Sequence, residues 1–91
     1  VSIKANYPNP FNPSTTIPVK VSQRDYMQIN IFDSNGKLVK KLFNGELSIG
    51  QYSFRWNGLD EHNTLVGSGI YFCKIIKHNN IISSQKMVLL K

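Results

Sequence analysis

The chain has 91 residues, of which 41% are hydrophobic and 18% are charged. A chain of this size has room for one hydrophobic core, so we predict a single domain of modest stability over residues 1–91. The composition excludes a disordered polar tail. No apolar run approaches the roughly 18 residues that a membrane-spanning helix needs, so we expect no membrane span.

The formal net charge is +6, which raises the question of a nucleic-acid partner. The basic residues are scattered, however, and their densest group is only Lys37, Lys40 and Lys41. No recognition-helix or single-strand-binding motif accompanies them. We therefore expect ordinary solubility, no nucleic-acid partner and a monomer.

Apolar residues alternate with a period of two throughout the chain, and no helical spacing is sustained, which predicts an all-β fold. Residues 1–6 are either a linker remnant or a short first strand. Residues 15–22 form a strand in which Ile17, Val19 and Val21 share one face. Pro18 lacks an N–H group and therefore places this strand at an edge or a bulge.

Residues 27–32 follow as a strand with Met27, Ile29 and Ile31 facing inward. The next residues include Asn35-Gly36, which predicts a type I′ hairpin turn leading to a strand over residues 38–43.

Residues 51–56 then place Tyr52, Phe54 and Trp56 on one face, which is the clearest core stripe of the chain. A glycine-containing loop over residues 57–69 precedes a long apolar strand at 70–76, and a turn leads to the closing strand at 81–91. About seven short strands separated by turns predict an antiparallel β-sandwich or barrel, and we favour the sandwich.

In the last strand, apolar side chains occupy both faces: Met87 and Leu89 share one parity, and Val88 and Leu90 share the other. This pattern indicates either burial on both faces or an unfilled partner site. We favour burial on both faces.

No catalytic or metal-binding pattern emerges. The two histidines and the group Asp60, Glu61 and Asn63 lack the spacing of known metal sites. Cys73 lies in an apolar run and is interpreted as a small buried hydrophobic residue. We therefore expect no enzyme activity, no metal and no cofactor.

Four segments, "YPNPFNPSTTI", "GQYSFRWNGLD", "VGSGIYF" and "KMVLLK", occur in an order and spacing that resemble the type A C-terminal sorting domain of type IX secretion cargo. The resemblance covers nearly the whole chain. It implies an Ig-like β-sandwich at the C-terminus of a larger secreted protein.

In that family the domain is a non-catalytic sorting signal for protein transport. The resemblance implies recognition by an outer-membrane translocon and removal by a surface sortase-like peptidase. The partners would therefore be this machinery and an upstream cargo domain of the same polypeptide. The destination would be the cell surface or the medium of a Gram-negative bacterium, reached through the periplasm.

Carried over by position, the resemblance assigns a sorting-signal tail and a set of structural motif residues. The tail comprises Lys86, Met87, Val88, Leu89, Leu90 and Lys91. The structural motif residues are Tyr7, Pro8, Asn9, Pro10, Phe11, Asn12, Pro13, Gly50, Tyr52, Trp56, Gly58, Asp60, Ser68, Gly69, Ile70 and Tyr71.

One departure from the family pattern concerns the loop after Trp56, where Asn63 is followed by Thr64 rather than by glycine. Asn tolerates positive φ better than other non-glycine residues, so we expect Asn63 to adopt it. Cys73 stands where the family commonly has an aromatic or aliphatic side chain.

The central segments also resemble the Ig-like module of the flagellar hook-cap scaffold, which lacks the paired proline start and the lysine-ended tail. A structural Ig-like domain of an appendage is therefore one alternative function. A second alternative is a carbohydrate-binding or adhesive module of a secreted enzyme, with Tyr26, Phe32 and Phe43 as stacking candidates.

Two structural expectations concern the chain ends. Residues 7–14 should be ordered and packed on the sandwich, with Tyr7 and Phe11 as anchors and with Asn9 and Asn12 bonding their own backbone. The last strand, lying at a sheet edge, could add to a sheet of the receptor through its main chain.

Overall fold

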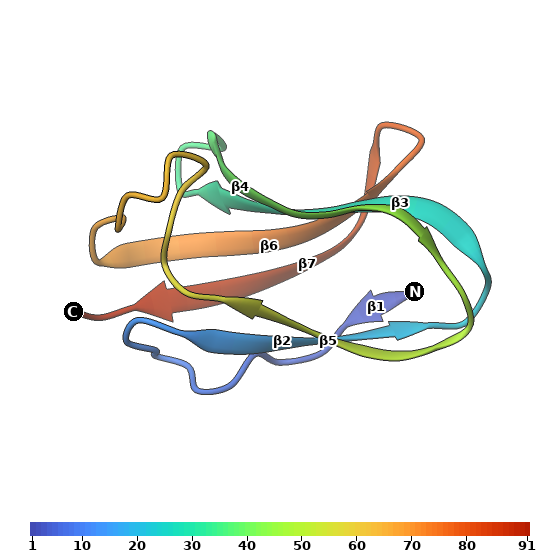
Figure 1. The fold of residues 1–91 in the computed structure, drawn as a ribbon, viewed down its shortest axis with the longest axis horizontal. Coiled ribbons are helices and arrows are strands. Elements are labelled where there is room, and N and C mark those ends of the chain that lie inside the picture. The colour runs from blue at the N-terminus through green and yellow to red at the C-terminus, as the bar shows by residue number, and fades with distance from the viewer.

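The computed structural model describes residues 1–91 and contains seven strands and no helix. The strands are β1 (Ser2–Ile3), β2 (Thr15–Val21), β3 (Asp25–Asp33), β4 (Leu38–Leu47), β5 (Gly50–Trp56), β6 (Gly69–Lys77) and β7 (Asn80–Leu89). They form a three-stranded sheet in the order β1-β2-β5 and a four-stranded sheet in the order β4-β3-β6-β7. All strand pairs are antiparallel. The two sheets pack face to face as an Ig-like sandwich, which confirms the predicted fold class (Figure 1).

The core lies between the sheets and follows the alternation in the sequence. Each of the predicted inward-facing stripes of β2 and β3 is buried. On β5, Trp56 is buried, whereas Tyr52 and Phe54 are only half-buried and pack against the margin of the core. The fully buried side chains of highest volume are Trp56, Phe11, Ile17, Ile29, Ile31, Ile75, Met87 and Leu89.

The last strand is buried on one face only, so the predicted burial on both faces is wrong. Met87 and Leu89 are 0% exposed, whereas Leu90 is 53% exposed. Val88 is half-buried on the outer face of the four-stranded sheet, opposite Ile70 of β6. β7 is the end strand of this sheet, and no second layer covers its outer face.

The hairpin between β3 and β4 has a different turn from the predicted type I′. Of Asn35 and Gly36, only Gly36 has positive φ, at 82°. Gly36 N donates to Asp33 O (3.0 Å), and the Asp33 carboxylate accepts from the backbone N–H groups of Asn35 and Lys37 (both 2.9 Å). These bonds favour a three-residue loop with glycine in the left-handed region.

Two positive-φ residues of the type I′ kind occur instead at the β6–β7 hairpin. His78 and Asn79 have φ values of 50° and 63°, between the paired residues Lys77 and Asn80. Histidine and asparagine are among the non-glycine residues that enter the left-handed region most readily.

β2 lies between β1 and β5, so the expectation that Pro18 marks an edge strand is wrong. Pro18 O accepts from Lys4 N (2.9 Å), which shows that the main chain of Pro18 faces the β1 side. On that side the neighbouring strand has only two residues, and the missing N–H group therefore interrupts little pairing.

β4 is longer than expected and continues through Leu47. Its pairing with β3 shifts register after Ile29 and again after Ile31. Such bulges bend and twist a strand, so the edge that β4 forms is not flat.

Candidate functional site

The segment that contains the prolines packs onto the sandwich through one aromatic side chain. Phe11 is buried, and its ring centroid lies 5.6 Å from that of Trp56, which lies 5.2 Å from that of Tyr71. The expectation that residues 7–14 pack on the fold is confirmed by this contact. Tyr7 is 58% exposed, so its assignment as a core anchor is wrong; only its main chain is held, by reciprocal hydrogen bonds with Thr16 (3.0 and 2.8 Å).

The same segment occupies the outer edge of β7. Phe11 N donates to Val88 O (2.9 Å), and Leu90 N donates to Phe11 O (3.0 Å). Val88 N donates to the side-chain Oδ1 of Asn9 (2.9 Å). Asn9 thus caps a strand edge instead of bonding its own backbone as expected, and no hydrogen bond of that kind is formed by Asn12. The start and the end of the motif set are therefore directly joined.

Further contacts continue this cover towards the start of β7. Ile3 N donates to the Ser83 hydroxyl (3.0 Å), and Gln85 Nε2 donates to Oδ1 of the buried Asn6 (3.3 Å). Asn6 in turn donates to the Thr15 hydroxyl (2.9 Å). The expected addition of β7 to a receptor sheet is therefore wrong at Val88–Leu90, because these main-chain groups already have partners in the fold.

The six tail residues differ in burial, and Val88 is half-buried. Met87 and Leu89 belong to the core, whereas Lys86, Leu90 and Lys91 are exposed. Lys91 N donates to the Ser68 hydroxyl (2.9 Å), which fixes the end of the chain against the loop before β6. A receptor that binds the folded domain can reach the exposed class and the half-buried Val88 only.

The central motif shapes the loop between β5 and β6. Trp56 Nε1 donates to Leu59 O (2.9 Å), and the Asp60 carboxylate accepts from the backbone N–H groups of His62 (2.8 Å) and Thr64 (3.0 Å). These hydrogen bonds hold the pKa of Asp60 below its ordinary value. Asn63 has a φ of 59°, which confirms the expected positive φ.

Glycine and tyrosine residues of the motif make further contacts around this loop and at the starts of β5 and β6. Gly58 has a φ of 76°, and a Cβ atom there would lie 3.1 Å from Pro13 O, so glycine allows the proline segment to approach. Gly50 and Gly69 are the first residues of β5 and β6. The hydroxyl groups of Tyr52 and Tyr71 donate to Ser48 O (2.8 Å) and Gly67 O (2.7 Å). Gly58, Tyr52 and Tyr71 therefore support the local structure through these contacts.

Burial raises the pKa of the Cys73 thiol to about 12, so the thiolate is not available near neutral pH. No group of three or more His, Cys, Asp or Glu side chains is placed to hold a metal ion. No helix is long and apolar enough to cross a membrane.

The three aromatic candidates for carbohydrate stacking lie in different environments. Tyr26 is exposed, and Phe32 lies beneath Lys74, whose Nζ is 5.1 Å from the ring centroid. Phe43 packs against Phe54 at 5.7 Å between the sheets. Tyr26 and Phe32 share a face of β3 but are separated by about 20 Å of strand. They do not form one platform.

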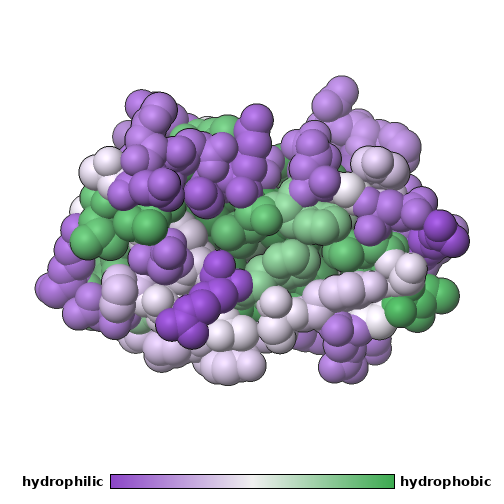
Figure 2. Space-filling view, in the orientation of Figure 1, coloured by the Kyte–Doolittle hydropathy of each residue, from purple (hydrophilic) through white to green (hydrophobic).

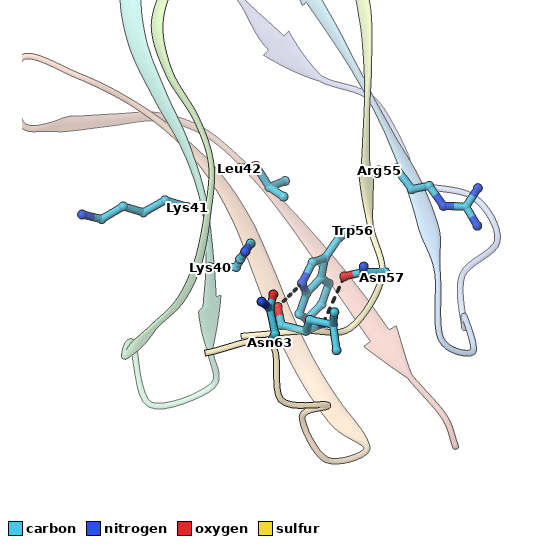
Figure 3. Close-up of a pocket in the computed structure, with 8 residues that line it drawn as sticks. Lys40, Lys41, Leu42, Arg55, Trp56, Asn57 and Asn63 are labelled. Atoms are coloured by element: carbon cyan, nitrogen blue, oxygen red, sulfur yellow. Dashed lines mark hydrogen bonds between the residues drawn. The ribbon is translucent and has the colours of Figure 1, made fainter. Parts of the chain in front are cut away.

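Sequence reasoning missed the open side of the sandwich, where β4 and β5 are the end strands of their sheets. A cleft of about 330 Å³ lies there, lined by Lys40, Lys41, Leu42, Arg55, Trp56, Asn57, Leu59 and Asn63. Figure 3 shows Trp56 between the two sheets, with Lys41 and Arg55 pointing outward on opposite sides. The sequence signal was present in the half-buried aromatic stripe of β5, but which strand lay opposite could not be read from it.

Among solved structures, the chain is similar to dimeric latent PorU from Porphyromonas gingivalis, with 18% identity and a TM-score of 0.71 over 97% of this chain and 9% of that chain. It is also similar to PorZ of that organism, described as an essential surface component of the type-IX secretion system. The identity there is 20% and the TM-score 0.62, over 98% of this chain and 11% of that chain. This chain thus spans about a tenth of either protein, and the likeness shows the shared fold.

No curated protein sequence matches the chain. Residues 12–80 match the FlgD Ig-like domain family. This match covers most of the sandwich, from the end of the proline segment to the start of β7. The chain therefore belongs to the FlgD Ig-like domain family.

Proposed function

We propose that this chain is a non-catalytic C-terminal sorting domain that directs a larger cargo protein through the type IX secretion system to the cell surface. The Ig-like fold and the likeness to segments of PorU and PorZ support the association with that system. The sorting role itself rests on the two ends of the chain.

The observation that carries the proposal is the direct contact between these ends. The proline segment up to Phe11 and the tail at residues 86–91 both lie outside the matched family region of residues 12–80. They are nevertheless bonded to each other through Asn9, Phe11, Val88 and Leu90. Both ends contribute to the core, through Phe11, Met87 and Leu89. They are also joined at the surface outside the matched region, and this joining supports a shared task in addition to the fold.

In this proposal the receptor recognises side chains and not the main chain of β7. The sandwich holds the tail by burying Met87 and Leu89, and the alternation of the strand therefore directs Lys86 and Leu90 outward. Lys91 lies exposed beyond the end of β7. None of the exposed lysines of the tail takes part in an ion pair. An acidic receptor surface with an apolar contact for Leu90 would complement this arrangement.

The partners in this proposal are an outer-membrane translocon, a surface sortase-like peptidase and an upstream cargo domain. The host is a Gram-negative bacterium, and the cargo passes through its periplasm. The domain itself carries no enzymatic activity and no cofactor. It acts as a sorting signal in the monomeric state.

The test is delivery of a reporter fused before Val1, in a bacterium that has the secretion system. Deleting residues 86–91 is a poor test, because it also removes the buried Met87 and Leu89. We therefore use Leu90→Glu combined with Lys91→Glu. The matched control is Ile81→Glu, since Ile81 lies at the other end of β7 and is 57% exposed, close to the 53% of Leu90.

We expect the tail variant to leave the thermal unfolding temperature of the domain nearly unchanged while the reporter accumulates in the periplasm. The Ile81→Glu control should be delivered to the surface as the wild type is. Normal delivery of the folded tail variant would contradict the proposal.

A structural Ig-like domain of an appendage is the second candidate, and the family match itself favours it. This candidate predicts regular self-assembly of the isolated domain, measurable by light scattering and electron microscopy. The sorting proposal predicts that the domain stays monomeric under the same conditions.

A further inference from the structure

β5 presents an edge whose main-chain groups have no partner. The reciprocal hydrogen bonds of Thr16 with Tyr7 show that Thr16 directs its main chain away from β5. Because main-chain direction alternates along a strand, Ile17 and Val19 bond to Phe54 and Tyr52 of β5. The N–H and C=O groups of the intervening β5 residues, Gln51, Ser53 and Arg55, therefore point outward, and they form no hydrogen bond within the fold.

The other sheet edges differ from this one. β1 has only two residues, and the proline segment occupies the edge of β7 at Val88–Leu90. β4 is bulged, and Glu61 caps it: Glu61 N donates to Val39 O (3.1 Å), and Lys41 N donates to the Glu61 carboxylate (3.2 Å). β5 pairs with β2 over its whole length without a register shift, so it is a regular edge along its seven residues.

An apolar groove runs beside this edge. Leu42 and Phe43 of β4 and Tyr52 and Phe54 of β5 are half-buried and pack against the margin of the core. Figure 2 shows a hydrophobic band between two hydrophilic rims at the level between β4 and β5. At one end the groove continues into the cleft of about 330 Å³ beside Trp56 (Figure 3).

The charges around the groove favour an acidic occupant. Lys40, Lys41 and Arg55 line the cleft. Lys40 lies 3.6 Å from Glu61, whereas Lys41 and Arg55 are in no ion pair. The chain as a whole carries a formal net charge of +6, so a second copy would bring like charges together. Charge complementarity therefore points to another polypeptide, rich in carboxylates.

We propose that the β5 edge binds an extended acidic segment of a partner polypeptide by strand addition. The main chain of the segment pairs with the outward groups of Gln51, Ser53 and Arg55. Its alternate side chains are apolar and cover Phe43 and Phe54, and the others are acidic and lie beside Arg55. This site is on the opposite side of the sandwich from the tail and is independent of the sorting proposal.

The first experiment uses a blocked peptide of alternating glutamate and valine, matched in length to β5, and the isolated 15N-labelled domain. We expect saturable changes in amide chemical shift at Gln51, Ser53 and Arg55. The charge control is the corresponding lysine–valine peptide, which should bind at least tenfold more weakly. Binding of neither peptide, equal binding of both, or shift changes located mainly on β7 would overturn the proposal.

The second experiment uses Ser53→Pro. The N–H group that this change removes has no partner within the fold, and Pro is tolerated on edge strands, so the domain should remain folded. We expect at least a tenfold loss of peptide affinity. Ser84→Ala is the control, because Ser84 is an exposed residue of β7, which ends the other sheet and lies away from the β5 edge; its affinity should stay within about twofold.

Unchanged affinity in a folded Ser53→Pro variant would overturn strand addition at this edge. Dimers of the wild-type domain without peptide that dissociate on Ser53→Pro would instead identify a second copy as the occupant, which also contradicts the proposal. The tail variant, Leu90→Glu combined with Lys91→Glu, should bind the peptide normally. The peptide-binding and sorting proposals can therefore fail separately.

Discussion

Strands β5 and β7 each end a sheet, but one edge is bare and the other is covered at Val88–Leu90. The edge of β7 is occupied by residues from the other end of the chain, through Asn9 and Phe11. The edge of β5 is bare at Gln51, Ser53 and Arg55, with Arg55 as its only charged side chain. An uncovered regular edge is a template for pairing, so an edge left in this state in a small domain invites a partner.

The comparison also separates two means of recognition. At Val88 and Leu90 the main chain is already bonded, and recognition there is left to exposed side chains such as Leu90 and Lys91. On β5 the main chain itself is available, and specificity would come from the groove and the neighbouring cations. The first two predictions below alter the cover of the β7 edge, and the third concerns the loop whose Glu61 covers β4.

The largest effect is expected from Phe11→Ala, which removes the anchor of the proline segment. Phe11 is buried against Trp56, so the change leaves a cavity and should cost about 3–5 kcal/mol of the free energy of unfolding. Urea denaturation of the isolated domain measures this loss. The control Tyr7→Ala, in the same segment but exposed, should stay within about 0.5 kcal/mol of the wild type. Equal losses for the two variants would contradict the anchoring role of Phe11.

A smaller effect is expected from Asn9→Ala, which uncovers one donor of the β7 edge. The Val88 N–H group loses its acceptor Oδ1, and a hydrogen bond of this kind contributes about 0.5–1.5 kcal/mol. Denaturation should show that loss, and the Val88 amide should exchange faster with solvent. Asn12→Ala is the control, because the Asn12 side chain forms no hydrogen bond; if both variants lose the same stability, Asn9 is not the cap.

The smallest effect is expected on the pH dependence of stability, through Asp60 in the loop whose Glu61 covers the edge of β4. The pKa of Asp60 in the folded state lies below its ordinary value of 3.8, because Thr64 N and His62 N donate to the carboxylate. A lowered pKa contributes stability that is present above about pH 4 and lost as the pH falls through the folded-state value. The pKa of Asp25 is lowered as well, by the hydrogen bond from Lys77 and by that from Tyr26 N, and adds to the same slope.

Thermal unfolding between neutral pH and pH 2 measures this dependence. Asp60→Asn should give a flatter profile below pH 4 than the wild type, since its side chain does not titrate. Parallel profiles for the two proteins would show that the hydrogen bonds of Asp60 do not persist in solution.

Much of the fold could be predicted from the sequence, because the pattern that specifies it is local. The alternation at Ile17, Val19 and Val21 or at Met27, Ile29 and Ile31 determines which face is buried, whatever the strand pairs with. The buried state of Cys73 follows from the same parity. The seven strands and the sandwich architecture were predicted on this basis and are confirmed.

The errors arose where a side chain or a distant segment decides the outcome. At Asn35-Gly36 the carboxylate of Asp33 bonds two backbone N–H groups and favours a longer loop than the dipeptide alone indicates. The cap on Val88 comes from Asn9, 79 residues earlier, and no local pattern reveals it. In the tail, Met87 and Leu89 share the buried face, but the predicted burial of the face with Val88 and Leu90 was wrong, because a local pattern does not reveal whether a second layer covers that face.

Amide hydrogen exchange of the wild-type domain, followed residue by residue by NMR, tests the contrast between the two edges most directly. Covered main-chain groups exchange only when the fold opens, whereas uncovered ones exchange freely. We predict strong protection of the Val88 and Leu90 amides and little protection of Gln51, Ser53 and Arg55. Rapid exchange at Val88 and Leu90, or protection of the three β5 amides in the monomer, would contradict the account.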